Sequence, residues 1–372
     1  MKLTLTRYLY ARDEVEASLL TSLLSKKDIC ESYFWAYELL CSGFDLFATL
    51  WKIYYDIYFE YNPSLETYIR KKHIEWEKQQ QCDDAVFATI LNNMFHAKPS
   101  CKVFMLRQDA CIKNRTGGSS YRGRRPKWCD NHDKKYHGWV LAISKKDYRQ
   151  IAYWTYDLVL GCTPTDALFA ELIKYFGSDF TINSNVCSYW DDRKYRDDAH
   201  YLLAIIIQLL ADVSLMATNI KVKTPRAEHL SWIQKLEPDA SIRVYRVLKE
   251  QRKYGVNRSI GSFALARHEL NVDALDMNRF WEYYAFQTPV WWGRFEKYNG
   301  ALDNAAKRVV FDNDDDLEDF YDLFGLEPDE QSREVQNLST AEIPRVPWVS
   351  WFEQAFAEES VVKFDETMRF AI

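Results

Sequence analysis

The chain has 372 residues, a formal net charge of −6, 47% hydrophobic residues and 16% aromatic residues. This composition excludes an intrinsically disordered chain, and the negative charge argues against general affinity for nucleic acid. Only 12 glycines and 10 prolines are present, too few for the many turns of an all-β domain. We therefore expect a mainly α fold: antiparallel helical array or bundle units with a long basic loop and an extended acidic C-terminal tail.

The N-terminal segment predicts helices with short connections, an arrangement typical of antiparallel neighbours. Asp28 and Glu31 have capping-box spacing, and Gly43 stands where a helix ends. Asn62 and Pro63 fit an N-cap followed by proline at the first helical position. The predicted helices cover residues 12–26, 28–43, 44–61, 62–78 and 84–96.

Residues 34–63 concentrate aromatic side chains, which suits a membrane segment, a base-stacking surface or a packed helical spine. Asp45, Lys52, Asp56 and Glu60 interrupt the run, so a membrane segment is disfavoured. The segment also holds more acidic than basic residues, and acids repel phosphate. The rings recur at three- and four-residue steps, which favours a packed helical spine.

A long basic loop is predicted over residues 98–138, because this Gly- and Arg-rich stretch has no periodicity. It interleaves cations with rings, which suits an arm that contacts an acidic protein surface, a nucleic-acid contact or a loop with no partner. We favour the protein contact. The interaction candidates are Tyr121, Arg122, Arg124, Arg125, Lys127 and Trp128.

The same loop holds weak zinc candidates. Cys129, His132 and His137 have metal-like spacing, and Cys111 could supply a fourth ligand. Lysines lie within the group, so ordinary polar loop residues are the favoured interpretation. We predict no cofactor.

The segment 139–300 predicts a second helical unit. Its beginning, residues 139–160, has mixed periodicity that allows a short strand. The apolar run 201–217 falls short of a bilayer span and predicts a buried helix, so no membrane span is expected. Helices are predicted over residues 163–177, 195–218 and 238–254, and the aromatic segment 278–298 is broken at Pro289.

Acidic residues gather just before the apolar run. Asp191, Asp192, Asp197 and Asp198, with His200, could hold Mg²⁺. Basic residues intervene, and acids at a helix start also favour the helix dipole. We therefore expect a salt-bridged first turn of the predicted helix.

Residues 301–372 form the predicted acidic tail, with 18 acidic and 6 basic residues and a net charge of −12. The chain after Asp316 is expected to be extended, with aromatic anchors at Trp348, Trp351 and Phe352. The rest of the chain carries +6, so the basic middle and acidic tail allow docking between like copies.

No enzyme signature is present: the sequence lacks G-x-x-x-x-G-K-[ST], G-x-G-x-x-G, H-E-x-x-H and G-x-S-x-G. We predict no enzymatic activity, with an unrecognised site as the alternative. The eight cysteines include no C-x-x-C pair and the first residues show no signal peptide, so an intracellular protein with reduced thiols is expected.

The stretch FWAYELLCSGFDLFATLWKIYYDIYFEYNPSLETYIRKK, preceded by RYLYARDEVEASLLTSLL and followed far along the chain by LEDFYDLFGLEPDEQS, resembles helical proteins of nucleocytoplasmic large DNA viruses. The resemblance covers residues 7–72 and, more weakly, 311–332. It implies packing and turn roles for matching positions such as Phe34, Trp35 and Gly43, and carries over no catalytic residue.

Some members of this group act as minor capsid proteins. The resemblance therefore implies a structural virion protein, a cement or scaffold that bridges major capsid subunits and other minor proteins. It implies location in the capsid, and in the host cytoplasm during assembly. The alternative is a nucleic-acid-binding virion or transcription-associated protein that uses the basic loop.

Overall fold

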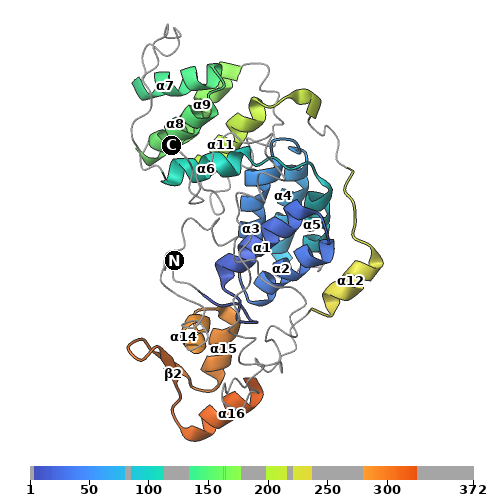
Figure 1. The fold of residues 1–372 in the computed structure, drawn as a ribbon, viewed down its shortest axis with the longest axis vertical. Coiled ribbons are helices and arrows are strands. Elements are labelled where there is room, and N and C mark those ends of the chain that lie inside the picture. The colour runs from blue at the N-terminus through green and yellow to red at the C-terminus, as the bar shows by residue number, and fades with distance from the viewer. Residues whose placement is uncertain are drawn as a thin grey trace. The chain divides into compact units, whose positions relative to one another are not determined.

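The computed structural model describes residues 4–79, 85–112, 134–161, 163, 165–176, 198–215, 221–236 and 280–324. This part of the chain is mainly α-helical, as the sequence predicts, with one two-stranded antiparallel sheet (Figure 1). The chain divides into two compact units that alternate along the sequence. Unit 1 comprises residues 1–49, 87–95 and 224–348, and unit 2 comprises residues 50–86, 96–223 and 349–372.

Two helices carry the chain between the units, so their residues belong to both. They are α3 (Leu46–Ile53) and α5 (Ala85–His96). Unit 1 also contains α1 (Arg12–Ser25), α2 (Ile29–Cys41), α12 (Ala227–Gln234), α14 (Trp281–Ala285), α15 (Pro289–Lys297), β1 (Ala301–Asp303), β2 (Arg308–Val310) and α16 (Asp314–Phe324).

The first two helices of unit 1 follow their local sequence signals. The predicted helix over 12–26 is α1, which packs on α2 through a buried stripe that includes Val15 and Leu19. The side chain of Asp28 caps α2 by accepting a hydrogen bond from the backbone N–H of Cys30 at 2.9 Å. Side-chain capping satisfies an amide that the helix itself leaves unpaired.

Gly43 ends this helical pair in a left-handed conformation, with φ of 85°. A Cβ atom at this position would lie 2.6 Å from Cβ of Pro289, the first residue of α15. Both the backbone angle and this close approach therefore require glycine.

We expect Gly43→Ala to lower the free energy of unfolding by about 2–3 kcal/mol, because the strained φ and the contact with Pro289 both act against the side chain. Gly293→Ala is the matched control, since a Cβ there meets no atom within 4 Å and the residue lies inside α15. The control should be neutral or stabilising. Urea denaturation of both variants measures the difference, and equal effects would contradict the prediction.

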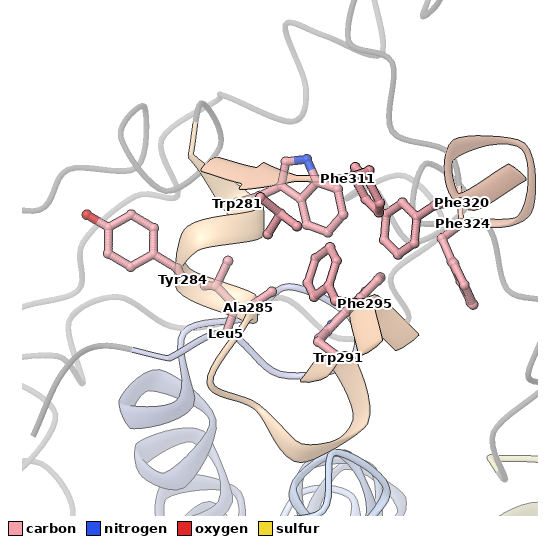
Figure 2. Close-up of a cluster of buried hydrophobic side chains, with 10 residues drawn as sticks. Leu5, Trp281, Tyr284, Ala285, Trp291, Phe295, Phe311, Phe320 and Phe324 are labelled. Atoms are coloured by element: carbon pink, nitrogen blue, oxygen red, sulfur yellow. The ribbon is translucent and has the colours of Figure 1, made fainter. Parts of the chain in front are cut away.

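The C-terminal part of unit 1 has an aromatic core of its own. Figure 2 shows side chains from α14, α15 and α16 that point toward one another, with Leu5 of the N-terminal segment beside them. The ring of Phe295 stacks on that of Phe320, with centroids 4.8 Å apart. The buried members are Leu5, Trp281, Tyr284, Ala285, Trp291, Phe295, Val309, Phe311, Phe320 and Phe324.

This core corrects the prediction that the chain is extended after Asp316. Residues 314–324 form α16, because Phe320 and Phe324 recur at helical spacing and bury against the core. The β1–β2 hairpin precedes it, with Leu302 paired to Val309. The remainder of the predicted tail lies outside the described residues.

Unit 2 packs helices from distant parts of the sequence. Helices α6 (Lys102–Ile112), α8 (Tyr148–Leu160) and α11 (Asp198–Leu209) contact one another, and α7 (Lys134–Ser144) packs on α8 (Figure 1). The π-helical turn η1 (Tyr54–Tyr58) contacts α6 and α11. The unit also contains α4 (Leu65–Gln79), α9 (Thr165–Phe176) and the short 3₁₀ turn η5 (Val213–Leu215).

Three local predictions in unit 2 are wrong. Residues 139–160 contain helical segments and no strand, because Asp147 caps α8 and buried side chains such as Trp139 pack between α7 and α8. Helix α11 ends at Leu209, because Asp212 accepts hydrogen bonds from the backbone N–H and hydroxyl of Ser214. Asn62 does not cap α4, since its side chain donates to the carbonyl oxygens of Tyr58 and Lys98.

Helices also reach into both ends of the predicted basic loop, as α6 and α7. Within the described part of the chain, no helix has the length and apolar character needed to cross a bilayer.

Candidate functional site

The π-helical turn η1 gathers buried charges in unit 2. Its i→i+5 hydrogen bond joins the N–H of Phe59 to the carbonyl oxygen of Tyr54 at 2.9 Å, and all five residues of the turn are buried. Such turns are rare and frequently occur at functional sites. This one carries Asp56 into the interior.

Asp56 is held by an arginine and a histidine from other elements. Arg107 of α6 donates from Nε to Oδ1 at 2.9 Å and from Nη2 to Oδ2 at 2.7 Å, a bidentate pair. Nε2 of His200, in α11, lies 2.9 Å from Oδ1. Burial alone raises the pKa of Asp56, but Arg107 and His200 outweigh it and hold the pKa well below its usual range. The carboxylate is therefore charged and already bound by side chains of its own chain.

A second buried carboxylate lies one turn further along. Glu60 accepts a 2.6 Å bond from Nζ of Lys102 and a short bond from the hydroxyl of Ser100. The pair ties the end of the η1 segment to the start of α6. The carboxylate of Glu60, like that of Asp56, is therefore bound by side chains of its own chain.

Glu66 differs, because no described cation forms an ion pair with it. It is buried in α4 and accepts a 3.2 Å hydrogen bond from the hydroxyl of Tyr55. Burial raises its pKa to about 8, and the Tyr55 hydrogen bond and the charge of Arg70 offset this only in part. Glu66 is therefore mainly protonated at neutral pH and can act as a hydrogen-bond donor.

This protonation predicts a pH dependence of stability. The folded-state pKa lies above the ordinary value of 4.5, so the stability contributed by Glu66 is fully present below pH 4.5 and is lost as the pH rises toward about 8. We expect the free energy of unfolding of Glu66→Gln, relative to that of the wild type, to increase as the pH rises through this window. The increase should be at most about 1.4 kcal/mol per pH unit.

Denaturation curves at several pH values measure this difference, in which groups common to both proteins cancel. The exposed Glu75→Gln serves as the control and should show a flat difference from pH 5 to 8. A flat difference for Glu66→Gln as well would contradict the prediction.

Unit 1 contains a buried ion pair between the N-terminal segment and α2. Nε of Arg7 donates to Oε2 of Glu38 at 2.9 Å, and Nη2 donates to the carbonyl oxygen of Leu236 at 2.9 Å. The backbone N–H of Arg7 donates to Oγ of Ser42, and that of Tyr8 donates to Oε1 of Glu38. The N-terminal segment is therefore held against α2 through polar contacts of both backbone and side chain.

The same segment also reaches α15. Nε1 of Trp291 donates to the carbonyl oxygen of Thr6 at 3.1 Å. The hydroxyl of Thr288 donates to the carbonyl oxygen of Leu5 at 2.5 Å. These bonds join residues more than 280 positions apart in the sequence.

Most of the sequence-predicted site residues lie outside the described part of the chain. This holds for Cys129, His132, Tyr121, Arg122, Arg124, Arg125, Lys127, Trp128, Trp348, Trp351 and Phe352. Cys111 lies in α6 and His137 is half-buried in α7. Within the described residues, no group of three or more potential ligands is placed to hold a metal. The zinc and loop-contact predictions stay predictions.

His200 belongs to a different contact from the expected one. The sequence groups it with the acids of residues 191–198, whereas the structure places it on Asp56. Residues 191–197 and the side chain of Asp198 are not described. Sequence reasoning also missed Glu66 and the Arg7–Glu38 pair. The signal available was a run of charges inside an apolar helical pattern, which marks charges that need buried partners.

Comparisons with protein-family models, with curated proteins and with solved structures find no match to this chain.

Proposed function

We propose that this protein is a structural assembly protein of a virion, a minor capsid protein that bridges major capsid subunits and other minor proteins. The observation that carries the proposal is the acidic α16 face, which we define by its exposed residues. They are Asp314, Asp315, Leu317, Glu318, Asp319 and Asp322.

The acidic α16 face is unpaired and partly apolar. Within the described residues none of its carboxylates forms an ion pair. The buried carboxylates Asp56 and Glu60, in contrast, both form ion pairs. Leu317 is 40% exposed among the acids. An apolar side chain with charged neighbours suits contact with a protein surface of opposite charge, where charge guides the approach and apolar burial stabilises the contact.

The buried charges of both units also support a structural role. Asp56, Glu60 and Glu38 each bind a cation from a different segment of the chain, so their chemistry serves to hold elements together. The resemblance of residues 7–72 to virion proteins supplies the biological setting. The partners that the proposal implies are capsid proteins and other copies of this chain, whose residues 102–135 carry an excess of basic side chains.

The test is the composition of purified virus particles. We expect the chain at a fixed ratio to the major capsid protein, and a lowered ratio for the double variant Leu317→Ser, Glu318→Gln. Leu160→Ser is the matched control, because Leu160 is an exposed leucine of unit 2. Loss of the chain from particles on gentle washing would sink the proposal.

A second arm addresses nucleic acid. If the basic loop binds nucleic acid, affinity should fall steeply with salt and vanish in the triple variant Arg122→Ala, Arg124→Ala, Arg125→Ala. That result would replace the purely structural role by the nucleic-acid alternative.

A further inference from the structure

Arg294 of α15 occupies an aromatic setting in unit 1. Its guanidinium carbon lies 4.4 Å from the centroid of the Trp291 ring and 4.9 Å from that of Phe324. Both rings are buried members of the core in Figure 2, whereas Arg294 itself is half-buried. Contacts with ring faces hold a guanidinium in place and leave its N–H groups directed outward from the rings.

No acceptor in the described part of the chain satisfies Arg294. It forms neither a hydrogen bond nor an ion pair there, in contrast with Arg107 and Arg149, which bind carboxylates in bidentate fashion. A guanidinium has five donors and no acceptor, so a half-buried one with no partner is unusual.

A second arginine nearby has a spare donor. Arg7 is 3% exposed and uses Nε and Nη2 on Glu38 and Leu236, but its buried Nη1 has no partner. A buried donor without an acceptor costs the full desolvation of that group.

The cluster carries one positive charge in excess. Arg7 and Arg294 contribute two positive charges, and Glu38 contributes one negative charge. The pKa of Arg294 is lowered to about 10, first by burial and then by the charge of Arg7, with Tyr8 and Glu38 acting in the opposite direction. Arg294 therefore remains charged at neutral pH, and the pair of arginines lacks one negative charge.

We propose that Arg294, with Arg7 beside it, binds a carboxylate group. A carboxylate matches the planar fork of a guanidinium and supplies the one negative charge that the cluster lacks. A phosphate near neutral pH carries more than one charge and would bring the excess next to Glu38. The carboxylate can come from an acidic side chain of another protein or from a small organic acid. The site stands whether or not the protein is a capsid component.

The test uses the full chain and isothermal titration calorimetry at constant ionic strength. The probes are acetate, the peptide acetyl-Gly-Glu-Gly-Glu-Gly-amide, its glutamine counterpart, and inorganic phosphate. Arg294→Gln should weaken carboxylate binding about tenfold or more, since it removes charged hydrogen bonds. Lys297→Gln, an exposed cation on the same helix, should leave binding unchanged.

Arg294→Lys keeps the positive charge but lacks the planar fork, so it should also weaken carboxylate binding. It serves as the test variant if Arg294→Gln folds poorly. Tighter binding of the glutamate peptide than of acetate assigns a protein-borne carboxylate, and equal binding of both assigns a small acid. Three results would each overturn the proposal: no carboxylate binding by the wild type, binding that Arg294→Gln leaves intact, or phosphate bound more tightly than acetate.

Discussion

Asp56→Ala is expected to lower the free energy of unfolding by about 3–5 kcal/mol, because it leaves the largely buried guanidinium of Arg107 without its carboxylate partner. Arg107 loses two charged hydrogen bonds, and His200 loses the carboxylate 2.9 Å from its Nε2. The contacts join η1 to α6 and α11, so the loss should appear in the unfolding of unit 2. Urea denaturation followed by tryptophan fluorescence measures it.

The control for Asp56→Ala is an ion pair of equal length at the surface. Nζ of Lys72 lies 2.7 Å from Oε2 of Glu75, the same distance as Nη2 of Arg107 from Oδ2 of Asp56. Glu75→Ala should change stability very little, because water screens an exposed pair. Similar effects of the two substitutions would show that burial does not govern the strength of the Asp56 contacts.

Glu38→Met is expected to cost about 3–5 kcal/mol in unit 1 for the same physical reason. It removes the partner of the buried Arg7 guanidinium and the acceptor of the Tyr8 backbone N–H. The N-terminal segment should then detach from α2 at lower denaturant concentration, which hydrogen exchange of the amides of residues 5–11 can follow.

The double variant Arg7→Met, Glu38→Met separates the charge from the packing. It removes both charges, so it should be less destabilised than Glu38→Met alone. The single variant Arg7→Met completes the comparison. If the double variant lowers the free energy of unfolding by the sum of the two single effects, the unpaired guanidinium is not the source of the destabilisation.

Local signals predicted much of the fold correctly. Asp28 caps α2, Gly43 ends the helical pair, and Pro289 breaks the aromatic segment 278–298 between α14 and α15, each for a reason contained within a few residues. The aromatic residues of 34–63 are largely buried in helices, which agrees with a packed spine.

Predictions failed where contacts distant in sequence decided the outcome. The acidic segment 314–324 is helical because Phe320 and Phe324 meet a core built partly from Leu5 and Trp281. Helix α11 is shorter than its apolar run because the side chain of Asp212 competes for nearby backbone N–H groups. Asn62 is a residue type that commonly caps helices, but its side-chain amide donates instead to the carbonyl oxygen of Lys98.

The sequence by itself determined the helical class, since low glycine and proline content, capping residues and three- to four-residue periodicity are all local properties. Only the tertiary structure decided which charges meet. Asp56 finds Arg107, 51 residues away, and Arg294 lies over Phe324 with Arg7 nearby. Charge pairing across elements depends on how the helices pack, so the local sequence around one partner does not predict the other.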